Sequence, residues 1–122
     1  MTQMVLAMFD LPDGPLDAAA HFLAEQVPMA RELLDGTAQL PGPGLPKDLE
    51  ALAFIFPSAA KDHHGWRVAA IQALAREATP KRVNGVVGDD LEAIAEVTDW
   101  LANAPGITGQ LLAVDGKSPE TR

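Results

Sequence analysis

Residues 49–56 read LEALAFIF, a segment that contains the apolar run ALAFIF (51–56) and that Pro57 ends. Consecutive apolar side chains would face both sides of a pleated strand, which is typical of a parallel sheet covered on both faces. A shorter run at residues 4–9, MVLAMF, is ended by turn-forming residues and has the same character. With RVNGVV and ITGQLLAV further along, the predicted strands are Met4–Phe9, Leu49–Phe56, Arg82–Val87 and Ile107–Val114.

An amphipathic helix is predicted between the first two strands, over residues 15–35. Its apolar positions recur at three- and four-residue spacing, namely Ala19, Phe22, Leu23, Val27, Ala30, Leu33 and Leu34. Pro28 lies inside this stripe, and because proline lacks a backbone donor it should kink or break the helix near Val27. Gly36 then suits the C-terminal stop of this helix.

Two further helices are predicted downstream. Trp66–Ala78 carries one apolar face, and Pro80 stops it; the face consists of Ala70, Ile71, Leu74 and Ala78. The last helix runs to about Asn103, with Asp89 as its N-cap and Glu92 completing a capping box. Its predicted inner face consists of Leu91, Ile94, Ala95, Thr98 and Leu101.

Strands that alternate with helices imply right-handed crossovers and a parallel sheet with helices on its faces. The predicted fold class is therefore α/β, half of a doubly wound, Rossmann-like sheet with four parallel strands and three helices. Residues 36–48 contain three Pro and three Gly and are predicted to form a surface loop. We expect one domain over residues 1–116 and a polar tail at 117–122.

Composition excludes several classes of protein. The chain has 122 residues, with 9 Lys and Arg against 17 Asp and Glu, a formal net charge of −8, and no Cys. This balance argues against nucleic acid or an anionic membrane as the partner, and the acidic surplus is typical of a solubilising surface. The absence of Cys excludes disulfides and zinc–thiolate sites. No run spans a bilayer and no signal peptide is recognised, so a cytoplasmic location is expected.

Residues 69–76 (AAIQALAR), 82–84 (RVN) and 107–116 (ITGQLLAVDG) resemble the C-terminal half of short-chain dehydrogenases/reductases. The resemblance covers residues 66–116 by sequence and residues 1–65 by element order alone. It implies that the four predicted strands are the last four of the family's seven. The strand and Gly-rich turn that hold the nucleotide would then be absent, and no G-x-G-x-x-G occurs in the chain.

The same resemblance implies that the family's catalytic residues are missing. The family uses a Tyr as acid/base, a Lys four residues later and a Ser that holds the substrate, but this chain has no Tyr. Aligning AAIQALAR puts His64 at the Tyr position and Val68 at the Lys position, and a one-residue shift gives His63 and Arg67 instead. Ser58 is the candidate for the Ser, at about half the family's spacing from His64. We therefore expect a pseudoenzyme with no catalytic, cofactor-binding or metal-binding residues.

Other groups of polar residues have simpler interpretations. A metal or acid/base site at residues 62–64 (DHH) is weaker than a solvated loop, because a third ligand at a sensible spacing is absent. A triad of Ser58, Asp62 and His64 lacks the G-x-S-x-G elbow. An acidic pair at residues 89–90 is explained by helix capping at Asp89.

Two aromatic residues, Trp66 and Trp100, occupy apolar helix positions and suit core or interface packing.

Three functions remain open. The first is association, with itself or with a full-length dehydrogenase, because removing three strands would expose the edge of Met4–Phe9. The family's oligomer-forming elements would be retained at residues 15–35, 66–78, 91–103 and 107–114. The second is a small-ligand-binding module in the crevice at the carboxyl ends of the strands, near Asp10, Ser58, His64 and Gly88. The third and weakest is an enzyme that reuses Ser58 and His64.

Overall fold

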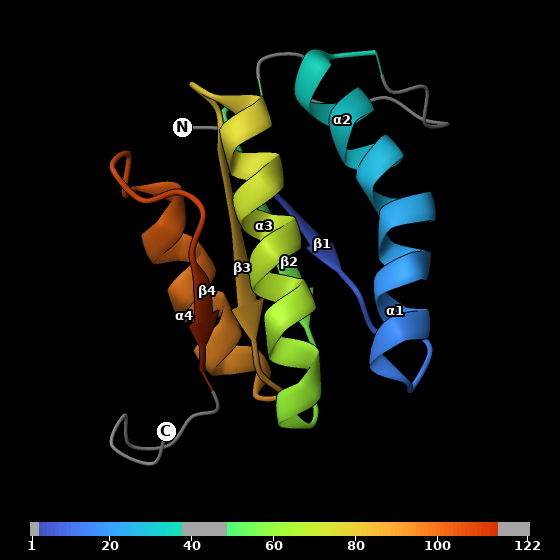
Figure 1. The fold of residues 1–122 in the computed structure, drawn as a ribbon. Coiled ribbons are helices and arrows are strands. Elements are labelled where there is room, and N and C mark those ends of the chain that lie inside the picture. The colour runs from blue at the N-terminus through green and yellow to red at the C-terminus, as the bar shows by residue number, and fades with distance from the viewer. Residues whose placement is uncertain (1–2, 38–48, 115–122) are drawn as a thin grey trace.

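The computed structural model describes residues 3–37 and 49–114. Its single sheet has four parallel strands in the order β1-β2-β3-β4, which confirms the predicted α/β class (Figure 1). The strands are β1 (Gln3–Ala7), β2 (Ala51–Phe56), β3 (Arg82–Val87) and β4 (Leu111–Ala113). Most of the predicted loop at 36–48 and all of the predicted tail at 117–122 lie outside the described residues.

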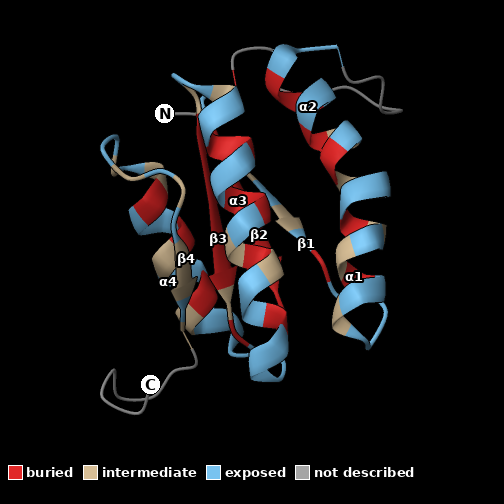
Figure 2. Cartoon of the chain, in the orientation of Figure 1, coloured by how far each residue is buried: buried red, intermediate tan, exposed pale blue. Residues whose placement is uncertain are grey.

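Helices cover both faces of this sheet. One face carries a continuous helical segment that consists of α1 (Pro15–His21), the π-helical turn η1 (Phe22–Gln26) and α2 (Val27–Asp35). The separate helix α3 (His64–Ala78) lies on the same face. The opposite face carries α4 (Leu91–Ala102). Every residue of β2 is buried, as its uninterrupted apolar run predicts (Figure 2). Phe54 packs on the α1–α3 side, whereas Ile55 packs against α4.

The third crossover differs from the prediction. The connections β1-α-β2 and β2-α3-β3 are right-handed, as expected. The β3-α4-β4 connection steps in the same direction across the sheet but passes over the opposite face, so it is left-handed (Figure 1). Its path follows from packing: Leu111 of β4 already contacts the core on the α3 side, while Ile94 and Leu101 bury against Ile55 and Val86 on the other.

The predicted disturbance near Val27 is a π-helical turn and not a break. The backbone N–H of Val27 bonds to the carbonyl of Phe22, five residues back, and Pro28 follows at once. The wider turn changes the phase of the helix, so Leu23, predicted to be buried, is exposed. Gly36 ends the helix in the left-handed conformation (φ 79°), as predicted.

The start of the last helix also differs from the prediction. The N-cap is Asp90, whose carboxylate accepts from the backbone N–H groups of Glu92 and Ala93, and not Asp89. Leu91 and Ala95 are exposed, so the inner face is narrower than predicted and consists of Ile94, Thr98 and Leu101.

The remaining boundaries move by a few residues. β1 ends at Ala7, two residues before the predicted end, although Met8 still donates its backbone N–H to the carbonyl of Ile55. A 3₁₀ turn, η2 (Lys61–His63), precedes α3, so helical structure begins earlier than Trp66.

Residues 107–110, predicted to be strand, instead wrap around the start of β3. The buried side chain of Asn84 donates to the carbonyl of Ile107 over 3.0 Å and accepts from the N–H of Gln110 over 3.1 Å. The hydroxyl of Thr108 accepts from the N–H of Val83. The side chain of Arg82 donates to the carbonyls of residues 101 and 104 at the end of α4. The RVN and TGQ motifs thus join β3, α4 and β4.

Candidate functional site

The carboxyl ends of β1 and β2 and the start of α3 surround a small pocket of about 160 Å³. It brings together Ser58, His63 and Arg67, with Phe9 and Asp13 on the β1 side. His63 and Arg67 are the pair that the one-residue-shifted alignment places at the family's Tyr and Lys positions. The main alignment places His64 and Val68 there instead, and neither of these residues lines the pocket.

His63 is buried and fully hydrogen-bonded, which corrects the prediction of a solvated loop. The indole Nε1–H of Trp66 donates to its Nδ1 over 3.1 Å, and its Nε2 lies 2.9 Å from the carbonyl oxygen of Asp13. Because an indole only donates and a carbonyl only accepts, these contacts suit the tautomer with its hydrogen on Nε2. Neither ring nitrogen is free to accept a proton from a substrate.

Arg67 lies one helical turn further along α3 and is 5% exposed. Its Nη1 donates to the carbonyl of Pro57 over 3.0 Å, and its guanidinium carbon lies 4.8 Å from the centre of the Phe56 ring. Burial lowers the pKa of Arg67 from its ordinary value. A guanidinium keeps its proton in proteins, so this side chain supplies charge and donors but no proton transfer.

Ser58 is exposed and is bound to the loop that follows β3. Its backbone N–H donates to the Asp89 carboxylate over 3.1 Å, and this bond chiefly holds the pKa of Asp89 below its ordinary value. Asp89, predicted to cap a helix, therefore links the ends of β2 and β3. No hydrogen bond joins Ser58 to His64 or Asp62 within the part of the chain that the structure describes.

The four residues predicted to surround a ligand crevice do not meet in one pocket. Ser58 lines the small pocket, while Asp10 lines a separate hollow of about 70 Å³ beside η1. His64 lines a third pocket, between α3 and β4. Gly88 is buried, and a Cβ there would lie 1.8 Å from the carbonyl oxygen of Val114. Its role is close packing of the β3 end against the end of β4.

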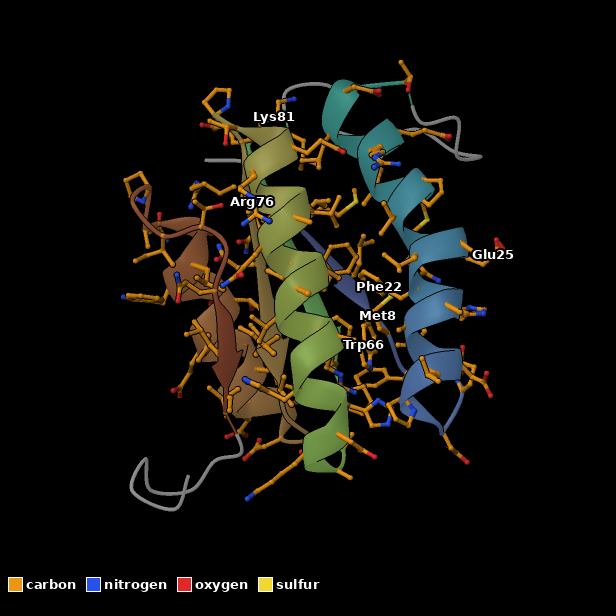
Figure 3. All side chains as sticks on the ribbon, in the orientation of Figure 1. Met8, Phe22, Glu25, Trp66, Arg76 and Lys81 are labelled. Carbon is orange, nitrogen blue, oxygen red and sulfur yellow. The ribbon has the colours of Figure 1, made fainter. Side chains whose placement is uncertain are left out.

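The two tryptophans behave differently. Trp66 packs as predicted, with its ring centre 5.5 Å from that of Phe22 and 5.8 Å from that of Phe56. Figure 3 shows Trp66, Phe22 and Met8 close together between α3 and the α1–η1 segment. Trp100 is 56% exposed, so it is not part of the core.

The burial of Arg67 and the Asn84 contacts are the features that sequence reasoning did not predict. Arg67 precedes Ala70, Ile71 and Leu74 by three, four and seven residues, so helical spacing alone places it on the buried face. A cation on such a face is a signal that could have been recognised. Nothing in the spacing of Asn84 and Gln110 indicates that they meet.

Two searches of the described residues are negative. No group of three or more His, Asp or Glu side chains there is arranged to hold a metal ion. Over residues 3–37 and 49–114, none of the helices combines the length and apolar character required to cross a membrane.

Comparison with known proteins gives one match. The family model for short chain dehydrogenase-like proteins matches residues 6–114. The match therefore extends into the N-terminal half, where the resemblance rests on element order alone. Neither the curated proteins nor the solved structures include a match. Because the family match spans most of the 122 residues, the chain belongs to the short chain dehydrogenase-like family.

Proposed function

We propose that this chain is a non-catalytic short chain dehydrogenase-like protein that acts by associating with a second copy of itself along β1. The observation that carries this proposal is the free edge of β1. Among the described residues, only β2 pairs with this strand. Residues 3–7, QMVLA, contain no charged residue and no proline. Edge strands of monomeric proteins commonly carry such residues to prevent pairing with another chain.

The two faces of β1 support the same conclusion. Met4 and Leu6 pack against the core on the α1–α3 side. Val5 points to the opposite face and is 46% exposed, because α4 packs mainly over β2 and β3. The side chain of Gln3 links β1 to α4, donating to the carbonyl of Thr98 over 2.9 Å. An uncharged edge beside an exposed β-branched side chain favours addition of another strand.

A second copy is the simplest partner for such an edge. Antiparallel pairing of β1 with β1 of another copy would place the same surface on both sides of a two-fold axis. It would satisfy the unpaired edge of both copies and extend the sheet without a change of fold. The net charge of −8 would oppose approach of two copies, but the β1 residues do not contribute to it.

The non-catalytic part of the proposal rests on the residues of the small pocket. Both ring nitrogens of His63 are engaged, and Arg67 cannot exchange protons near neutral pH. The pocket volume of about 160 Å³ is below the range of ordinary small-molecule sites. The chain has no Tyr that could take the family's acid/base role.

Sedimentation velocity over a range of protein concentrations tests self-association. We expect a dimer for the wild-type chain and a monomer for Val5→Lys, because a charge beside the edge opposes strand pairing. Leu91→Lys is the matched control, since Leu91 is exposed at the start of α4, which follows β3 and packs mainly over β2 and β3, and it should leave the dimer intact. A wild-type monomer, or a Val5→Lys dimer of unchanged stability, would overturn the proposal. A wild-type monomer that forms a mixed complex with a full-length dehydrogenase would assign a different partner.

A further inference from the structure

The pocket lined by His64 lies between the start of α3 and β4, and Arg67 lines both it and the small pocket beside Ser58. The volume of the pocket lined by His64 is about 580 Å³, within the range of small-molecule sites. Among the described residues that line it, three are basic and none is acidic; the basic ones are Lys61, His64 and Arg67. The facing wall is apolar and consists of Val87, Leu111 and Ala113. The pocket is thus basic at one end and apolar along the other side.

Arg67 is a buried cation that lacks a counter-ion in the described structure. It is 5% exposed, and its buried Nε has no hydrogen-bond partner among the residues described. Its Nη1 donates to the Pro57 carbonyl, and no carboxylate of residues 3–37 or 49–114 forms an ion pair with it. A buried charge without an anion is costly, so a site that retains one favours binding of an anion from outside.

The aromatic neighbours hold the guanidinium without using its donors. Its central carbon lies 4.8 Å from the Phe56 ring centre and 5.8 Å from that of Trp66. Ring faces attract the cation, but they do not replace an oxygen acceptor for the N–H groups. The side chain is therefore held in place with unused donor capacity.

The charge distribution makes this basic group unusual for the chain. The whole chain carries 17 acidic against 9 basic residues, yet none of the acidic residues that the structure describes lines this pocket. The positive end of the α3 dipole lies at the same place, since α3 begins at His64. Anions would therefore be attracted to this pocket although the protein as a whole repels them.

We propose that this pocket binds a small organic monocarboxylate with an apolar body, such as a short acyl chain. The carboxylate would accept hydrogen bonds from Arg67 and compensate its charge, with Lys61 and His64 at the rim. The apolar body would bury against Val87 and Leu111. A bare inorganic anion would leave this apolar wall unused. The proposal is independent of self-association, because β4 and β1 are at opposite edges of the sheet.

Calorimetric titration with hexanoate, hexanol and inorganic phosphate tests the proposal. We expect saturable binding of hexanoate at concentrations up to about 10 mM, and weaker binding of the other two. Arg67→Gln should weaken hexanoate binding about tenfold or more, since it removes a charge-assisted hydrogen bond. Arg76→Gln makes the same change on an exposed part of α3, outside this pocket, and should have no effect (Figure 3).

A second variant tests the proposal even if the Arg67→Gln chain does not fold. Lys61→Glu reverses a charge at the exposed rim, and we expect it to weaken hexanoate binding several-fold without loss of fold. In NMR spectra, hexanoate should shift the methyl signals of Val87 and Leu111 in the wild-type chain. The proposal is overturned if hexanoate does not bind, or if hexanol or phosphate binds as tightly as hexanoate. It is also overturned if the folded Arg67 and Lys61 variants bind hexanoate as tightly as the wild type does.

Discussion

The indole N–H of Trp66 donates to Nδ1 of His63 over 3.1 Å, and this bond connects the aromatic core to the polar end of the sheet. The Trp66 ring packs against Phe22 and Phe56, so its position is set by the core. His63 in turn holds the carbonyl of Asp13 at the start of the α1 segment. A buried His at this position is therefore a structural link between α3 and the loop after β1.

Trp66→Phe tests this link. The substitution keeps most of the apolar contact but leaves the buried Nδ1 of His63 without its donor, so we expect destabilisation of about 1–3 kcal/mol. Urea unfolding at neutral pH provides the measurement. Trp100→Phe is the control on the exposed side of α4 and should change the free energy of unfolding by less than about 0.5 kcal/mol. Equal effects of the two variants would contradict the assignment.

Asn84→Ala tests the contacts that hold residues 107–110 on β3. The buried amide of Asn84 donates to the carbonyl of Ile107 and accepts from the N–H of Gln110. Its removal leaves both backbone groups without this hydrogen bond. We expect a loss of about 2–5 kcal/mol in the free energy of unfolding. Asn103→Ala, at an exposed helix end, should cost less than about 1 kcal/mol. Hydrogen exchange at the Gln110 amide should accelerate in the Asn84 variant alone.

Gly88→Ala tests the close approach of the β3 end to the end of β4. The added Cβ would meet the carbonyl oxygen of Val114 at 1.8 Å, so the backbone must move. We expect destabilisation of about 3 kcal/mol or more. Gly106→Ala places a Cβ where nothing lies within 4 Å and should be close to neutral in thermal unfolding. A Gly88→Ala protein as stable as wild type would show that the two segments can separate freely.

Asp89→Asn tests the bond to Ser58 through its pH dependence. Hydrogen bonds from Ser58 lower the pKa of Asp89 in the folded chain, so its contribution is present above the unfolded pKa. That contribution is lost as the pH falls through the lowered folded pKa. Between neutral pH and about pH 3, the urea midpoint of Asp89→Asn should therefore fall less than that of the wild type. Asp99→Asn controls for the loss of one carboxylate, and an identical fall for both variants would contradict the assignment.

The sequence predicts local structure well where the pattern of apolar residues is clear. The run at residues 51–56 is β2, and RVNGVV is β3, with the bounds predicted for the latter. The predicted strand Ile107–Val114 is too long, because the sequence ITGQ does not show that a distant side chain binds the backbone of residues 107–110. The side chain of Asn84 bonds to the backbone of Ile107 and Gln110, so these residues do not pair as a strand and β4 begins only at Leu111.

The candidate site was less predictable than the fold. Ser58, His63 and Arg67 were each considered from the sequence, but residues 62–64 (DHH) were interpreted as a solvated loop. Burial of His63 depends on Trp66 and on the carbonyl of Asp13, which is fifty residues away in the chain. Asp10 and Gly88 were expected to line a crevice with Ser58, yet they face other parts of the structure.

The order of strands and helices and the parallel sheet follow from local apolar periodicity, and the resemblance to the family follows from short motifs, so both can be predicted without the structure. The face that α4 covers is set by tertiary packing, since β2 is apolar on both faces and permits either side. Only the tertiary structure separated Arg67 from its possible counter-ions and placed it beside an apolar wall. Long-range packing sets the surroundings of a charge, and residue spacing does not encode those surroundings.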